Sequence, residues 1–227
     1  MLFPTPAFAL FFVCVFIISW QFPKKSRIRK VILLIASYVF YACWDVRFTL
    51  LLAGCSFGNY FFGRAIGELD ADAHRKAVLA VGVFVNLAIL AVFKYFGFFI
   101  ASMANLLSVF GVPADPSMPG LFAVLLPVGI SFYTFQGISY CVDVYRRHVQ
   151  PSESMLDIFL YISFFPQLVA GPIIRASRFL PQITTQEADG VTHHPQAAAR
   201  REGIDGGRAF FLILGGLFKK MILAHYL

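Results

Sequence analysis

The stretch Phe164-Phe165-Pro166-Gln167-Leu168-Val169-Ala170-Gly171-Pro172-Ile173-Ile174-Arg175 decides how the chain around it can fold. It is apolar enough to enter a lipid bilayer. Pro166 and the Gly171-Pro172 pair rule out one uninterrupted helix, because proline lacks the backbone donor and clashes with the preceding turn. Non-helical backbone is tolerated at membrane depth only where protein or a water-filled cavity shelters it. The stretch therefore predicts a sheltered break of the kind that often forms binding sites in membrane proteins.

The composition is that of a polytopic membrane protein. The 227 residues are 59% hydrophobic and only 14% charged, whereas soluble domains carry about 25% charged residues. The longest polar run, 184–208, is too short to bury a core of its own. We therefore expect a single membrane domain over 1–227, surrounded by membrane lipid, with a cytoplasmic loop at 184–208.

The positive charge is distributed in a way that indicates membrane orientation. The net charge is +7, but the basic residues lie in short loops between apolar segments, which excludes nucleic acid as a partner. The first cluster follows the apolar segment 3–20 directly and would lie in the cytoplasm, leaving the N-terminus outside; it contains Lys24, Lys25, Arg27, Arg29 and Lys30.

The apolar segments between the basic loops predict an all-α integral membrane protein with about six transmembrane helices plus a re-entrant segment. The predicted spans are 3–20, the two arms of a hairpin over 31–63 that turns at 44–47, 77–93, 121–144 and 209–218. Segment 98–112 either extends the fourth span or lies in the interface, and 113–120 is an outer loop. This topology places 15 of the 19 lysines and arginines inside.

A polar stripe runs along the predicted span 121–144. Tyr133, Gln136, Tyr140 and Asp143 recur at spacings of three and four, which puts them on one helix face. A polar face on a spanning helix should point to the bundle interior or to a cavity. Two interpretations stay open, namely the lining of a permeation path or hydrogen bonding between helices. Asp143 is interpreted as structural because Arg147 follows it at i+4.

The segment 155–174 has arginines on both flanks, at 146–147 and at 175 and 178. The positive-inside rule therefore puts both of its ends in the cytoplasm. A segment of this length with both ends on one side cannot be a simple crossing. We expect it to be re-entrant or to lie flat, bending at Pro166 and at Gly171-Pro172.

The residues give no sign of a catalytic or metal site. The five histidines (His74, His148, His193, His194 and His225) have no carboxylate or cysteine at ligand-like spacing. Nucleotide-binding, hydrolase and metalloprotease motifs are missing from the sequence. Residue patterns alone thus predict a membrane bundle with a re-entrant segment, and they predict no reaction.

Four passages together resemble the bacterial membrane-bound O-acyltransferase family. They are residues 33–41, residues 125–133 running on to 143–146, residues 164–175 and residues 216–220. Alginate O-acetyltransferases are closest in pattern, and the D-alanyl transfer protein of teichoic acid modification is more distant. The resemblance implies a multi-pass protein of the bacterial inner membrane that O-acetylates an extracytoplasmic polysaccharide. It also implies acetyl-CoA or another acyl thioester as a cytoplasmic donor substrate, no permanently bound cofactor, and an extracytoplasmic acyltransferase as partner protein.

The resemblance also assigns roles to individual residues. Pro166, Gly171 and Pro172 would shape a break at the inner mouth of a donor tunnel. Gln167 would supply a polar contact there. Arg175 would lie near a CoA phosphate or act only as a positive-inside anchor. Lys219 and Lys220 close the last matching passage.

One departure from the family limits what this chain is expected to do alone. Family members are about twice as long, and their intramembrane catalytic histidine lies in the second half, which none of the histidines here matches. We therefore expect an N-terminal fragment that needs the missing C-terminal half and is inert by itself. The alternative functions are a channel or transporter, because a polar stripe also suits permeation, and a non-catalytic membrane scaffold.

Overall fold

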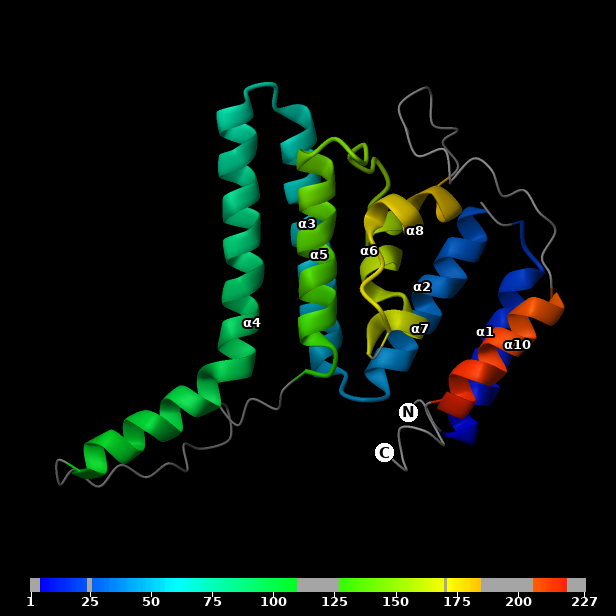
Figure 1. Ribbon diagram of the computed structural model, residues 1–227, viewed down its shortest axis with the longest axis horizontal. Coiled ribbons are helices and arrows are strands. Elements are labelled where there is room, and N and C mark those ends of the chain that lie inside the picture. Colours follow the sequence, from blue (N-terminus) through cyan, green and yellow to red (C-terminus); the bar gives the residue numbers. More distant parts are fainter. Residues whose placement is uncertain (1–4, 24–25, 110–126, 170, 185–205, 220–227) are drawn as a thin grey trace.

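The computed structural model describes residues 5–23, 26–109, 127–169, 171–184 and 206–219 (Figure 1). Within these ranges the chain is all-α and contains no strand, which confirms the predicted class. The helices in chain order are α1 (Pro6–Trp20), α2 (Arg27–Ala42), α3 (Arg47–Glu68), α4 (Asp72–Val109), α5 (Ile130–Tyr145), α6 (Met155–Ser163), α7 (Phe165–Leu168), α8 (Ala176–Ile183) and α10 (Gly206–Phe218).

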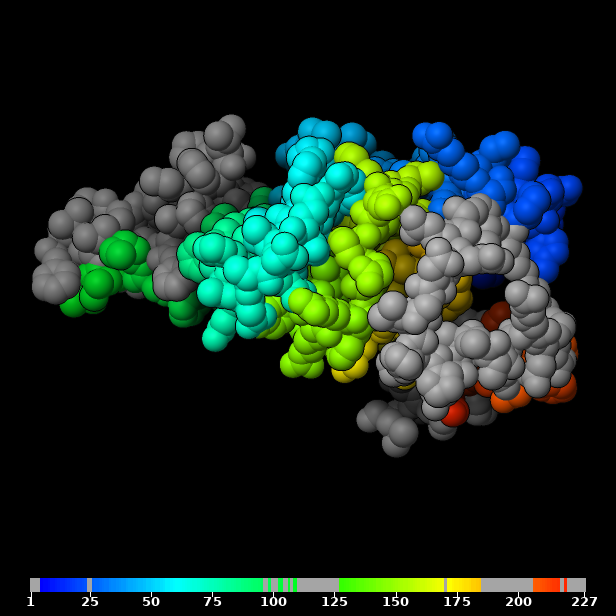
Figure 2. All heavy atoms as spheres, turned by 90° about the horizontal axis from the view of Figure 1, so that it is seen from above, coloured from blue at the N-terminus to red at the C-terminus, as the bar shows by residue number. Residues whose placement is uncertain are grey.

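Helices α1 to α6 stand side by side as a bundle. α3 contacts α2, α4, α5 and α6, and α2 contacts α1, α6 and α7. Seen from above, α1 and α2 lie at one end of the molecule, and the last part of α4 extends beyond the other end (Figure 2). The main core forms where α3, α5, α6 and α8 meet, around Tyr133, Tyr140 and Tyr161.

The connections group at the two ends of the bundle. The α1–α2, α3–α4 and α5–α6 connections and α8 lie at one end, which is at the top in Figure 1, and the α2–α3 turn and α7 lie at the other. Among the described residues, the basic segments at 27–30, 64–76, 146–147 and 175–178 therefore lie towards one end of the fold.

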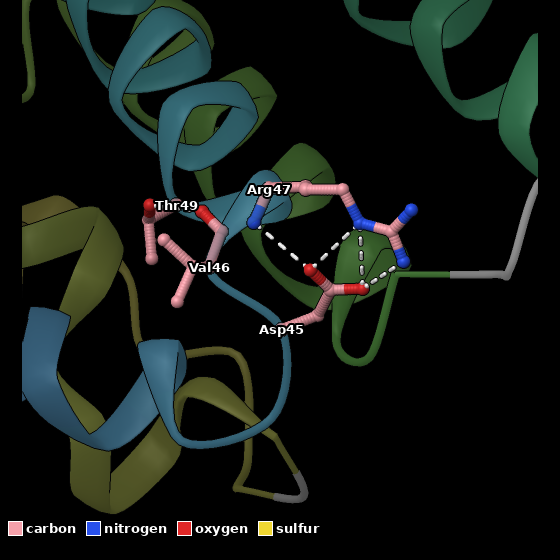
Figure 3. Close-up of polar contacts among 4 residues, drawn as sticks. All are labelled: Asp45, Val46, Arg47 and Thr49. Atoms are coloured by element: carbon pink, nitrogen blue, oxygen red, sulfur yellow. Dashed lines mark hydrogen bonds and ion pairs between the residues drawn. The ribbon is translucent and has the colours of Figure 1, made fainter.

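The hairpin predicted to turn at 44–47 is confirmed, since α2 ends at Ala42 and α3 begins at Arg47. Asp45 organises the turn (Figure 3). Its Oδ1 accepts the backbone N–H of Arg47 at 2.9 Å, and Arg47 Nη2 donates to Oδ2 at 2.9 Å. The arginine holds the pKa of Asp45 below its usual value through these hydrogen bonds.

The predicted basic loops were too long. Ser26 Oγ accepts the N–H of Ile28 at 3.2 Å, so α2 begins at Arg27 and takes up three residues of the first basic cluster. Likewise α3 runs to Glu68 and α4 begins at Asp72, so the basic residues of the second loop are helical; they are Arg64, Arg75 and Lys76. Hydropathy shows where a helix leaves apolar surroundings. It does not show where the helix ends, because lysine and arginine are good helix formers.

The segment 98–112 extends the preceding helix as far as it is described, because α4 continues without interruption to Val109. The last part of α4 turns away from the direction of the first (Figure 1). Among the described helices, only the part Asp72–Tyr95 is long and apolar enough to cross a membrane by those two criteria, while Pro6–Trp20 and Gly206–Gly216 are apolar but shorter. The expected six spans are therefore not confirmed.

The described part of the predicted span 121–144 is not helical throughout. α5 begins only at Ile130, after Pro127 and a left-handed Gly129 with φ of 77°. A Cβ at Gly129 would lie 2.6 Å from the carbonyl oxygen of Leu168, so glycine is required by the backbone angle and by the close approach. Residues 121–126 and the outer loop 113–120 lie outside the described residues.

The stretch around Pro166 is broken in both expected places. α6 ends at Ser163, the four-residue α7 begins at Phe165, and the backbone from 171 to 175 is not helical. Continuing α6 through Pro166 would press the proline ring against the carbonyl of Ile162. The segment descends through α6 and α7 and returns to α8 at the end where it started (Figure 1).

Candidate functional site

The polar face predicted on α5 points into the bundle, as expected. Tyr133, Gln136, Tyr140 and Asp143 are all buried. Tyr140 packs against α3 at Gly63, where a Cβ would overlap its ring, and its hydroxyl accepts the N–H of Ser152 at 3.1 Å. Tyr140 therefore acts in packing and in holding the α5–α6 connection.

Tyr161 of α6 is the centre of the buried polar contacts, and the sequence reasoning missed it. Gln136 Nε2 donates to its carbonyl oxygen at 2.6 Å and Gln167 Nε2 donates to the same atom at 3.3 Å. The Tyr161 hydroxyl donates to the carbonyl of Ile174 at 2.8 Å. One residue thus links α5, α7 and the returning backbone. A phenol inside an apolar segment, five residues before Pro166, was the available signal.

Two residues of α2, in the passage 33–41, reach the same region. Ser37 Oγ accepts the N–H of Phe165 at 3.2 Å and donates to the carbonyl of Leu33 at 2.8 Å. Four residues on, the Tyr41 hydroxyl donates to the carbonyl of Val128 at 3.1 Å, in the turn that precedes α5. These contacts were not predicted because they join residues far apart in sequence.

The ring of Phe165 anchors α7 to the first two helices. It meets aromatic rings of α1 and α2 at centroid separations from 5.3 to 6.3 Å, namely those of Phe8, Phe11, Phe12 and Phe40. Edge-to-face pairs of this kind add about 0.5–1.5 kcal/mol each beyond burial. The break is therefore held by apolar packing on one side and by hydrogen bonds on the other.

The residues of the quoted stretch have different surroundings. Gln167 is buried, and its Oε1 accepts no hydrogen bond from the residues that the structure describes. Gly171 lies so close to it that an added Cβ would be 2.5 Å from Gln167 Cα. Pro166 is half-buried, whereas Pro172 and Arg175 are exposed, so Arg175 is not part of the buried group.

Asp143 does not form the predicted pair with Arg147. Its Oδ1 lies 3.8 Å from Nδ1 of His148. Arg147 has a φ of 58° and the N–H of His148 donates to the carbonyl of Asp143 at 2.9 Å, so the backbone reverses at the end of α5. This turn brings the residue at i+5, and not the one at i+4, to the carboxylate.

The remaining predicted residues lie away from the break. Lys219 is exposed at the end of α10, and Lys220 lies outside the described residues, as do His193, His194 and His225. Within the described ranges, no three His, Cys, Asp or Glu side chains gather in a way that could hold a metal ion. The buried group around Tyr161 consists of amides and phenols. It can orient a molecule by hydrogen bonds.

Comparison with known proteins gives a consistent set of relatives. The chain is 37% identical over 210 residues to the probable alginate O-acetylase AlgI of Pseudomonas aeruginosa, covering 88% of this chain and 39% of that protein. It is 37% identical over 189 residues to the protein of the same name from Pseudomonas putida, covering 82% and 38%. The peptidoglycan O-acetyltransferase of Helicobacter pylori is 31% identical over 252 residues, covering 99% and 44%.

The chain therefore spans less than half the length of these relatives. No family model matches it. No solved structure matches it.

Proposed function

The chain belongs to the membrane-bound O-acyltransferase family, in the branch of bacterial polysaccharide O-acetyltransferases, and from this premise we propose that it takes part in the O-acetylation of an extracytoplasmic polysaccharide. The observation that carries the proposal is the 37% identity to an alginate O-acetylase over 88% of the chain. Alginate is the favoured acceptor, and peptidoglycan is the alternative because a second relative acts on it by name.

In the proposed topology the chain crosses the bacterial inner membrane about six times, with its N-terminus outside. The grouping of the α1–α2, α3–α4 and α5–α6 connections at one end of the bundle supports this, because these connections carry the basic segments. Helices such as α2 and α5 have 16 residues each, or about 24 Å at 1.5 Å per residue. They would need local thinning of the bilayer or flanking turns to cross it.

The broken segment α6–α7–α8 would be re-entrant from the basic end and would line the path of the acyl donor. An acyl thioester such as acetyl-CoA would enter there. Gln167 supports this assignment because its buried Oε1 is available to an N–H or O–H donor. Arg175 is exposed at the start of α8, where its charge would attract a phosphate of the donor.

In the proposed reaction an acceptor hydroxyl attacks the thioester carbonyl, so that a C–O bond forms and the C–S bond breaks. The hydroxyl proton ends on the departing thiol. The buried amides and phenols of this chain would orient the donor. We place the base that takes the proton in the part of the relatives that this chain does not cover. A partner acyltransferase outside the membrane would then move the acyl group from this first ester to a sugar hydroxyl of the polymer, and the proton of that hydroxyl would return to the first acceptor oxygen.

A chimera tests this proposal. The aligned part of the Pseudomonas aeruginosa protein is replaced by this chain and expressed in cells that lack the native protein, and the acetyl content of their alginate is measured. Restored acetylation is expected. A chimera that inserts into the membrane at normal amounts, yet leaves alginate unacetylated, would contradict the proposal. A matched Arg175→Ala chimera should raise the donor concentration needed for half-maximal transfer, and Arg178→Ala on the same helix serves as its control.

A further inference from the structure

At the break between α6 and α7, one backbone hydrogen bond of a continuous helix is not formed. Its donor and its acceptor each have a different partner. In a continuous helix the N–H of Phe165 would donate to the carbonyl of Tyr161, four residues earlier. Here the Phe165 N–H donates to Ser37 Oγ at 3.2 Å. The Tyr161 carbonyl instead accepts Gln136 Nε2 at 2.6 Å. A side chain of α2 thus accepts from the unpaired N–H, and a side chain of α5 donates to the unpaired carbonyl.

Each replacement is buried and fixed in orientation. Ser37 is fully buried, and its hydroxyl hydrogen is committed to the carbonyl of Leu33 at 2.8 Å, which leaves an oxygen lone pair for the amide. Gln136 is also buried and donates from α5. A buried backbone N–H or C=O that is left without a hydrogen-bond partner destabilises the fold. These two side chains therefore remove the penalty that would otherwise oppose the break.

The break determines where Gln167 lies. Pro166 prevents α6 from continuing through it, but nothing in the proline prevents Phe165 from closing one more turn onto Tyr161. If the Phe165 N–H bonded to the Tyr161 carbonyl, α6 would be longer. The residues after it would then be rotated about the helix axis by about 100° for each residue added to α6. Gln167 would then leave the carbonyl of Tyr161, to which it donates at 3.3 Å.

We infer that Ser37 and Gln136 are positioning residues that hold the α6–α7 break open and thereby fix Gln167. The effect on catalysis rests on the proposed function, which places Gln167 in the path of the donor. Ser37 acts on the amide side of the break and Gln136 on the carbonyl side. Neither residue needs to touch the substrate.

Hydrogen exchange of the protein in lipid nanodiscs tests the contact itself. Ser37→Ala and Gln136→Met should each raise amide exchange in the peptide covering 164–169 about tenfold, while peptides from α3 and α4 stay unchanged. Ser19→Ala is the matched control, because Ser19 is also buried and its Oγ donates only within its own helix, to Phe16 at 3.0 Å. Unchanged exchange at 164–169, or a rise spread over the whole bundle in both variants, would overturn the inference.

The kinetics of acetyl transfer distinguish a positioning role of Ser37 and Gln136 from a general effect on stability. In the acetyl-transfer chimera, both variants should reduce kcat about tenfold or more with little change in KM, and the double variant should be no worse than the more damaging single one. Strictly multiplied effects, or normal kcat despite raised exchange, would overturn the inference. Failure of the unsubstituted chimera to transfer acetyl would instead contradict the proposed function. The hydrogen-exchange result would still decide whether Ser37 and Gln136 hold the break open.

Discussion

Lys30 Nζ lies 2.6 Å from Asp157 Oδ1, and less than a tenth of either side chain is exposed. The pair joins the first turn of α2 to the first turn of α6, where the helix dipole also favours an anion. It holds the start of the broken segment against the helix whose Ser37 holds the break. From Lys30 to Ser37 is seven residues, so both side chains lie on one face of α2.

Removing the lysine alone should be strongly destabilising. Lys30→Met leaves Asp157 buried without its counter-ion, and we expect the free energy of unfolding to fall by about 3–5 kcal/mol. Denaturant unfolding in detergent measures it. Arg27→Met is the control because Arg27 is exposed one turn earlier. The double variant Lys30→Met/Asp157→Leu should recover most of the loss, and equal stability of the single and control variants would refute a role for the pair.

The guanidinium of Arg75 ties two helix ends together, so its shape should matter as much as its charge. It donates to the carbonyls of Ile66 at 3.1 Å and Tyr145 at 2.8 Å, among the last carbonyls of α3 and α5, which lack partners in their own helices. Arg75→Lys keeps the charge but loses the planar fork. We expect it to lower the free energy of unfolding by about 2–3 kcal/mol, since hydrogen bonds from a charged group contribute about 1.5–3 kcal/mol.

The neighbour of Arg75 provides the control for that measurement. Lys76 is exposed, whereas Arg75 is buried. Lys76→Met should leave the unfolding free energy within about 0.5 kcal/mol of the parent. If Arg75→Lys had an equally small effect, the contacts of Arg75 with the carbonyls of Ile66 and Tyr145 would contribute no net stability.

Local pattern was enough to predict the parts of this fold that depend on neighbours in sequence. The spacing of Tyr133, Gln136 and Tyr140 placed them on one buried face, because helical periodicity is a local property. Pro166 placed a break, because its clash involves only the preceding turn. The turn at 44–47 followed from charged residues between two apolar runs.

The contacts that position the site could not be read in this way. Lys30 and Arg75 counted only as inner charges, yet both are buried and bonded to distant segments. Ser37 looked like one small residue in an apolar run, although its partner is 128 positions away. Which helices become neighbours depends on how the whole set packs, and a single chain's periodicity does not specify those pairs.

Packing between α3 and α5 should depend on glycine at one position of α3. A Cβ at Gly63 would overlap the ring of Tyr140, which has no exposed surface, so Gly63→Ala must push the helices apart or displace the ring. We expect a loss of about 1–3 kcal/mol in unfolding free energy. Gly54→Ala on the same helix has nothing within 4 Å of the new Cβ and should be neutral or slightly stabilising. Similar values for the two variants would contradict this packing.

The pair in the α2–α3 turn should make stability depend on pH in the acid range. Arg47 lowers the pKa of Asp45 through side-chain and backbone hydrogen bonds (Figure 3). A carboxyl whose pKa is lower in the folded state stabilises it above the ordinary aspartate value of about 3.9, and this contribution disappears as the pH falls through the folded-state pKa. Asp45→Asn keeps an acceptor for the Arg47 amide but loses the charge. The parent should therefore be more stable than Asp45→Asn at pH 7, and the difference between their unfolding free energies should shrink towards zero below about pH 3.9. A difference that stays constant with pH would show that the ionised Asp45 does not stabilise the turn.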